Sequence, residues 1–467
     1  MSERGGKIKS YPLTPVQKVD LYQTLMGIFH RESGNVPISV IYEKDMDLGL
    51  LREALKIEIS RNDSMRIRLR FTLKGVRQSF PAEKDLGEIP FDDLLGKTEE
   101  EFDTYVRELN AKPVKTFRGE PYRLRFFRAP DGRYGIYGTF AHVAMDAGGV
   151  MLFYCNVANI YKALRDGEEL PPPMARFEDM IQKDIELFAN KERMERTVRF
   201  YEEYFTETAP GFFAGVDKMR DLKKTREKKR KPDFRGVETV HPLNDKSRTV
   251  KCHIDRDMME KIEAFCAEHR VSVQSVFQMG MRTHLSKVNE NCENVSMFMT
   301  VGRRATVADK NSGGSRALAH VVRASFGAET TFAQALKQLD RCNLRIYKHS
   351  EYSSVDEIYH LSRVDGLSPM YTTLPVLFTF FPKGRVPVPK GIDCEYYGSG
   401  NGHFVYAEYT MFVPNLRKGG YDCYYEYQTR SITREDVLLM HENLVKTVCA
   451  GMENPDITVG EIMEKVL

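Results

Sequence analysis

A histidine and an aspartate four positions apart, His142 and Asp146, are the residues of this chain whose types and spacing could do chemistry. A histidine ionises near pH ~6.5, so a neutral imidazole can take a proton from a nucleophile at neutral pH. His142 is therefore a candidate general base, and the alternative is a histidine buried for structural reasons. The His-x-x-x-Asp spacing often arises by chance, so the choice between the two depends on the rest of the chain.

Two predicted elements flank this pair. Residues 134–140 alternate in an aromatic-rich pattern typical of a strand, and residues 149–165 repeat apolar side chains at helical spacing. The turn signal at residues 130–132 predicts that the strand pairs with a second one over 122–128. His142 then lies where a strand ends and a helix begins, a position that holds a side chain rigidly and still lets it face a cleft.

The remaining patterns mix helices and strands along the whole chain. In the first half we expect a helix over 47–60, an alternating strand over 65–71 and a long helix over 177–205. In the second half the predicted strands are residues 250–254, 295–301, 318–326, 376–381, 404–412 and 421–428. The predicted helices there are residues 257–268, one capped by Ser272, residues 331–349 and one opened by Thr433.

These patterns predict an α/β fold of two similar lobes, each mixing hairpins with helices. With 467 residues the chain is longer than a protein that folds around a single hydrophobic core. We expect an N-terminal lobe over 1–175 that carries the histidine motif. A helical connector with a basic loop follows over 176–249, and a C-terminal lobe over 250–467.

Composition excludes several classes of protein. Hydrophobic residues make up 42% and charged residues 29%, which is typical of a soluble globular protein, and a net charge of +3 gives no argument for nucleic acid. No apolar run approaches the ~20 residues of a membrane span, and the polar N-terminus has no signal-peptide core. The eight cysteines lie at least 14 positions apart, so they form neither a metal knuckle nor a redox pair. We therefore expect a cytoplasmic protein with reduced thiols, no metal and no membrane span.

The segment 223–231 has seven basic residues among nine and is flanked by proline and glycine, so we expect an exposed loop. A solvated loop is the first interpretation. The second is docking of an acidic carrier protein or of a coenzyme A phosphate. Nucleic-acid binding is the weakest, because no aromatic side chains interleave with the charges.

Read in order, six short segments resemble the motifs of the condensation domains of non-ribosomal peptide synthetases, within the chloramphenicol acetyltransferase-like superfamily of thioester-dependent acyltransferases. Residues 142–148 are similar to the family's His-His-x-x-x-Asp-Gly signature, and residues 61–68 to its Arg-His-Glu-x-Leu-Arg-Thr-Arg motif. The other segments are residues 11–17, 302–304 with 313–314, 349–351 and 430–433. The sequence departs from the family where Ala141 replaces the first histidine, Ala147 replaces the glycine and Asn62 replaces a histidine.

The resemblance implies two lobes that form a V, with the active site in a tunnel between them. His142 would deprotonate or orient the nucleophile. Asp146 would not touch substrate but would form a salt bridge to Arg66, or to Arg68 on the same strand face, and so fix the loop of His142. Gly148 and Gly149 would line the substrate channel or merely permit the turn, and His403, in a flexible loop, is a weaker channel candidate.

The function implied is that of a stand-alone acyltransferase. It would transfer an acyl group from a phosphopantetheine or coenzyme A thioester, supplied in trans by an acyl- or peptidyl-carrier protein or as acyl-CoA. A small-molecule amine or alcohol would accept it, forming an amide or an ester, with no bound cofactor. The alternative is a catalytically silent relative that binds carrier proteins or partners, which Ala141 and Ala147 favour and the retained His142 opposes.

Overall fold

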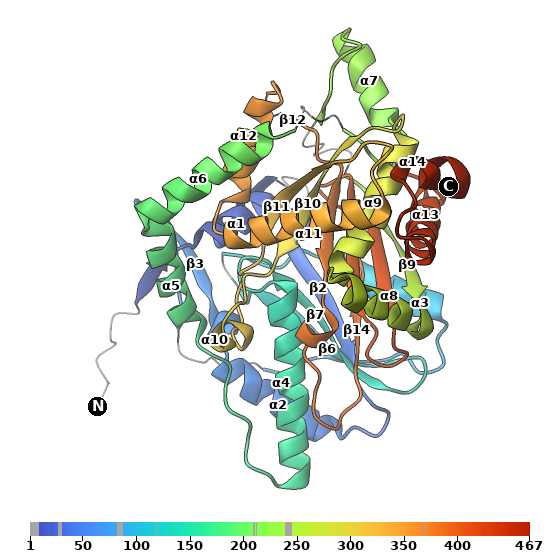
Figure 1. The fold of residues 1–467 in the computed structure, drawn as a ribbon. Coiled ribbons are helices and arrows are strands. Elements are labelled where there is room, and N and C mark those ends of the chain that lie inside the picture. Colours follow the sequence, from blue (N-terminus) through green and yellow to red (C-terminus); the bar gives the residue numbers. More distant parts are fainter. Residues whose placement is uncertain are drawn as a thin grey trace. The chain divides into compact units, whose positions relative to one another are not determined.

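The computed structural model describes residues 9–26, 30–81, 87–117, 119–208, 211, 213–238, 245–368 and 370–467. The chain divides into two compact units, whose helices and strands are labelled in Figure 1. The N-terminal unit comprises Met1–Asn190, Gly302–Ala317 and Val386–Gly402, and the C-terminal unit comprises Lys191–Val301, Leu318–Arg385 and His403–Leu467. This division differs from the three consecutive ranges expected from the sequence, because two segments of the second half belong to the N-terminal unit.

The main sheet of the N-terminal unit has five strands in the order β14-β2-β7-β6-β5. All its pairs are antiparallel except β5 with β6. The predicted hairpin is confirmed, with Phe126 opposite Ile136. The strand bounds are β14 (Glu395–Gly398), β2 (Asn35–Ile41), β7 (Tyr134–Ala141), β6 (Tyr122–Arg128) and β5 (Phe91–Asp93).

Helix α4 (Ala147–Asp166) follows β7 and packs against α2 (Leu48–Arg61) and β2. Its buried face has the helical spacing expected from the sequence, because Val150, Phe153 and Val157 are all inaccessible to solvent. A second sheet, in the order β1-β4-β3, consists of β1 (Ser10–Pro12), β4 (Gly75–Ser79) and β3 (Arg68–Thr72). The other helices of this unit are α1 (Pro15–Met26), η1 (Arg31–Gly34), η2 (Asp63–Arg66), α3 (Glu99–Asn110), α5 (Phe177–Ala189) and α10 (Val307–Lys310).

The C-terminal unit is built on a six-stranded sheet in the order β11-β10-β13-β15-β16-β9, in which β13 is parallel to both of its neighbours. The strands are β9 (Ser247–Ile254), β10 (Asn294–Val301), β11 (Leu318–Ser325), β13 (Val376–Phe380), β15 (Glu408–Pro414) and β16 (Tyr421–Gln428). A short pair joins β8 (Val237–Glu238) to β12 (Tyr371–Thr372). The helices are α6 (Lys191–Thr206), α7 (Arg220–Lys229), α8 (Arg256–His269), α9 (Val273–Val288), α11 (Phe332–Lys348), α12 (Ser354–Val364), η3 (Lys383–Arg385), α13 (Arg434–Glu453), α14 (Val459–Glu461) and η4 (Ile462–Val466).

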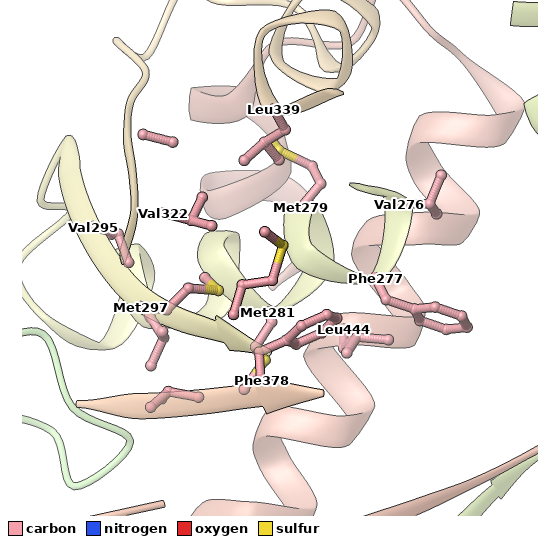
Figure 2. Close-up of a cluster of buried hydrophobic side chains, with 14 of the residues drawn as sticks. Val276, Phe277, Met279, Met281, Val295, Met297, Val322, Leu339, Phe378 and Leu444 are labelled. Atoms are coloured by element: carbon pink, nitrogen blue, oxygen red, sulfur yellow. The ribbon is translucent and has the colours of Figure 1, made fainter. Parts of the chain in front are cut away.

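The core of the C-terminal unit forms where α9 lies against the sheet and α13. Figure 2 shows Met279 and Met281 of α9 among side chains of the strands, with Leu444 of α13 beside them. At Gly280 an added Cβ atom would lie 2.9 Å from the carbonyl oxygen of Leu444, so only glycine lets the two helices approach this closely. Among the described residues, no helix is both long enough and apolar enough to cross a bilayer.

Three local expectations were wrong. The basic segment 223–231 is not a loop, because most of it lies in α7, which continues to Lys229. The long helix expected over 177–205 is interrupted at Asn190, whose extended backbone separates α5 from α6. The strand expected over 65–71 begins only at Arg68, because residues 63–66 form the 3-10 turn η2.

Candidate active site

The loop between β7 and α4 holds His142 in a fixed place. Its backbone N–H donates to the carbonyl of Gly34 (3.1 Å), and the Met145 N–H donates back to the carbonyl of Ala141. Val143 and Met145 are almost completely buried, whereas the His142 side chain keeps 31% of its surface exposed. The strand-to-helix position predicted for His142 is thus confirmed, with neighbours that anchor the loop and an imidazole that stays accessible.

A carboxylate lies beside this imidazole. Oδ1 of Asp20, on α1, is 3.0 Å from Nδ1 of His142, at ion-pair distance but outside the hydrogen-bond direction of the ring nitrogen. The other oxygen of Asp20 accepts a hydrogen bond from Oγ of Ser315 (2.5 Å). Asp20 is only 4% exposed, so its charge acts on His142 with little screening by water.

The charge state of His142 differs from that of a free histidine. Burial lowers its pKa, but the carboxylates of Asp20 and Asp146 raise it, and the result is a pKa of about 9. At neutral pH the ring is therefore mostly protonated. In this form it can donate a hydrogen bond to a developing oxyanion or a proton to a leaving group, and the deprotonated fraction is a stronger base than an ordinary imidazole.

The side chain of Asp146 is bound by an arginine and by the protein backbone. Its two oxygens bind the two terminal nitrogens of Arg304, each pair 2.8 Å apart. They also accept hydrogen bonds from the backbone N–H groups of Gly149, Arg316 and Ala317, at 2.9 to 3.0 Å. Burial raises the pKa of Asp146, but Arg304 and these backbone groups lower it by more, so the carboxylate is ionised.

These bonds make Asp146 the structural centre of the loop. Because it accepts from Gly149 three residues later, it is the N-cap of α4. The bonds to Arg304, Arg316 and Ala317 also tie the start of α4 to the segment 302–317, which returns from the second half of the chain. Asp146 thus forms a salt bridge to an arginine, but this arginine is Arg304 and neither of the two that were expected.

The pairing of Asp146 with Arg66 or Arg68 was wrong. Arg66 lies in the turn η2, where its guanidinium donates to the backbone carbonyls of Ser60 and Pro81. Arg68 instead binds both oxygens of Glu120, each 2.6 Å away. Since the turn separates Arg66 from β3, the two arginines do not share a strand face as the alternating sequence suggested.

The glycines after Asp146 serve close packing. A Cβ atom at Gly149 would lie 2.8 Å from Cγ of Met145 and 3.3 Å from the carbonyl oxygen of Gly314. One at Gly148 would lie 3.4 Å from the Arg304 guanidinium. Neither glycine has a positive φ angle, so what they allow is the close approach of the segment 302–317.

His403 belongs to the C-terminal unit and has a partner of its own. Its Nδ1 lies 2.8 Å from Oδ1 of Asp245, and its side chain is 17% exposed. A backbone bridge from Lys246 to His403 holds the same region. The structure therefore gives His403 a local structural role, and a place beside substrate stays a prediction.

A cavity of about 620 Å³ lies elsewhere in the N-terminal unit, along α4. Asn156, Lys162 and Lys390 are among the residues that line it. Neither His142 nor any of its contacts described above lines this cavity, so it is separate from the candidate chemistry.

Three residues of the site were missed by the sequence reasoning: Asp20, Arg304 and Ser315. A signal existed for Arg304, because the Gly302-Arg303-Arg304 segment already resembled a family motif. None existed for Asp20 or Ser315, which lie 122 residues before and 173 residues after His142.

A family model described as "Condensation domain" matches residues 7–373. The chain belongs to the condensation-domain family. It is 23% identical over 468 residues to surfactin synthase subunit 1 of Bacillus subtilis (strain 168), a match that covers 98% of this chain and 12% of that protein. Against surfactin synthase subunit 2 of the same organism it is 22% identical, covering 78% of this chain and 9% of the relative. The chain thus spans only a small part of these curated relatives.

Solved structures of condensation domains share the fold. The first condensation domain of the calcium-dependent antibiotic synthetase, in complex with a substrate analogue, superposes with a TM-score of 0.79 at 16% identity, covering 97% of this chain and 98% of that one. A starter condensation domain of rhizomide synthetase in complex with C8-CoA gives 0.76 at 14% identity, with 97% of each chain covered. The predicted α/β fold is therefore confirmed, and it is the fold of these condensation domains.

Proposed function

We propose that this condensation domain transfers an acyl group from a pantetheine thioester to an amine or a hydroxyl group. The proposal rests on the different surroundings of Asp146 and His142 in the loop after β7. Asp146 is bound by Arg304 and by backbone N–H groups, while the imidazole of His142 keeps 31% of its surface exposed and has Asp20 beside Nδ1.

In the proposed reaction the acceptor N–H or O–H attacks the thioester carbonyl. A C–N or C–O bond forms, the C–S bond breaks, and the sulfur leaves as a pantetheine thiol. The neutral form of His142 accepts the proton that the nucleophile loses and passes it to the departing sulfur, so no proton is gained or lost overall. Proton transfer of this kind contributes roughly 10² to 10⁴ in rate.

Two kinds of donor fit the proposal. The curated relatives are synthase subunits, which favours a carrier-bound thioester, and a solved relative is bound to C8-CoA, which favours a coenzyme A thioester. Both donors end in the same pantetheine arm. We therefore propose the thioester of this arm as the donor class, supplied in trans by a carrier protein or as acyl-CoA, with a small-molecule amine or alcohol as acceptor.

The test is a thiol-release assay. Acyl-CoAs and acyl-carrier thioesters are each offered with amines and with alcohols, and free thiol is measured for the wild type and for His142→Ala. The matched control is His269→Ala, since His269 is also a partly exposed histidine but lies at the end of α8. We expect a loss of 10²-fold or more in His142→Ala alone. Equal rates in His142→Ala and the wild type would overturn the role of His142 as the base. If no combination of donor and acceptor is turned over, the result supports the alternative of a catalytically silent protein.

A further inference from the structure

We propose that Asp20, oriented by Ser315, is the positioning residue of His142 and that its charge beside Nδ1 sets which ring nitrogen carries the proton. This inference rests on the proposed function of His142. It goes beyond it by assigning a role to a carboxylate that stands outside every motif named above.

The geometry brings three separate segments together. Asp20 lies on α1, His142 follows β7, and Ser315 belongs to the segment 302–317. Because Ser315 Oγ–H donates to Oδ2 of Asp20 (2.5 Å), the carboxylate is turned so that Oδ1 lies 3.0 Å from Nδ1 of His142. A carboxylate at Nδ1 favours a proton on that nitrogen, which leaves Nε2 as the atom that exchanges protons with substrate.

Helix α1 also holds the backbone of the loop. The side-chain amide of Gln17, one turn before Asp20, donates to the carbonyl of Val143 (3.0 Å). Gln17 is itself bound to Gln78, and both are completely buried. Thr24 donates from its hydroxyl to the Asp20 carbonyl (2.9 Å). The helix that carries the carboxylate is therefore fixed to the residue that follows His142.

Asp20 is also the dominant charge at the imidazole. Two carboxylates influence His142: Asp20 from α1 and Asp146 from the start of α4. Asp146 is neutralised by Arg304 and by three backbone N–H groups. Of the other cations of the segment 302–317, Arg303 pairs with Asp184, Arg316 with Asp184 and Asp309, and Lys310 is exposed. Asp20 accepts a hydrogen bond from the neutral hydroxyl of Ser315, and its charge contributes more than that of Asp146 to favouring imidazolium.

The test measures the His142 ring itself. Protein labelled on histidine carbon and nitrogen is titrated by NMR, with the His142 signals assigned from the spectrum of His142→Ala. In Asp20→Asn, which keeps the shape and an acceptor for Ser315, we expect the His142 pKa to fall from about 9 to 6.5 or below, because burial then acts with less opposition. The control Asp45→Asn removes an exposed carboxylate of the same unit and is expected to leave the titration unchanged.

Ser315→Ala separates positioning from charge. We expect the His142 pKa to stay near 9, while the fraction of neutral ring protonated on Nδ1 falls and kcat falls severalfold with little change in KM. An unchanged His142 titration and tautomer in a folded Asp20→Asn protein overturns the inference. That outcome is distinct from failure of the proposed function, which appears as full activity of His142→Ala whatever the titration shows.

Discussion

The two terminal nitrogens of Arg304 each donate a hydrogen bond of 2.8 Å to one carboxylate oxygen of Asp146, although the two residues lie 158 positions apart in the sequence. Such a bidentate pair fixes both the position and the orientation of the carboxylate. Because Asp146 also caps α4, the pair sets the start of the helix and the path of the loop that carries His142. The aspartate of the His-x-x-x-Asp motif is thus bound by protein groups, whereas the side chain of the histidine keeps 31% of its surface exposed to solvent.

Removing Asp146 should destabilise the protein. In Asp146→Ala, the half-buried Arg304 loses its counter-charge and α4 loses its cap, so we expect the free energy of unfolding to fall by roughly 3–5 kcal/mol. Denaturant unfolding of both proteins measures the change. Arg66→Ala is the control, expected to cost far less because the hydrogen bonds of Arg66 within the described part of the chain go to neutral backbone carbonyls. A fully stable and fully active Asp146→Ala protein would contradict the assignment.

Gly314 provides a second close contact between the segment 302–317 and the rest of the N-terminal unit. Its φ angle is +80°, and an added Cβ atom would lie 2.1 Å from the buried ring of Phe177. We expect Gly314→Ala to lower stability by roughly 2–4 kcal/mol, from the unfavourable φ angle and the clash together. Gly302→Ala is a matched control in the same segment, because nothing lies within 4 Å of its added Cβ atom. Similar melting temperatures for the two variants would refute this role for Gly314.

The charge of His142 predicts how stability depends on pH. Its pKa is about 9 in the folded chain and near 6.5 when unfolded, so the folded state binds the proton more tightly. This contribution to stability is complete below pH 6.5 and is lost as pH rises through about 9. Unfolding free energies at pH 6.5 and pH 9 should therefore differ more for the wild type than for His142→Gln. Equal differences in the two proteins would show that the ring is not protonated in the folded state.

The same pKa predicts a pH profile for activity. If neutral His142 is the base, kcat/KM should rise about tenfold per pH unit below pH 9 and then level off. An alcohol acceptor is the right substrate, because an amine titrates in the same range. Asp20→Asn should shift the rise to lower pH. A rate that falls as pH approaches 9 would instead identify the imidazolium as the active form and would overturn the role of base.

The basic helix α7 provides a prediction about donors. Lys223, Lys224, Arg230 and Lys231 of this region are exposed. Following the first interpretation, a solvated surface, we expect a variant with all four changed to glutamine to keep its kinetics within about twofold on acyl-CoA, at low and high salt. A large, salt-dependent loss with an acidic carrier protein as donor would instead support docking at this helix.

The local structure around His142 could be predicted from the sequence because it depends on residues that are close along the chain. Alternation over 134–140, the turn at 130–132 and the helical spacing after 149 each act within a few residues, and each predicted element is present. The capping box at Thr433 was readable for the same reason. Where local patterns failed, as for the helix α7, proline and glycine lay next to the segment but not within it.

The sequence by itself determined the α/β fold and the strand-to-helix position of His142. Only the tertiary structure decided which groups meet Asp146 and His142: Arg304 in place of Arg66 or Arg68, and Asp20 with Ser315 beside the imidazole. The physical reason is sequence distance. A buried carboxylate needs a cation and hydrogen-bond donors, but spacing along the chain does not say which distant segment brings them, and here it is the return of residues 302–317 into the N-terminal unit.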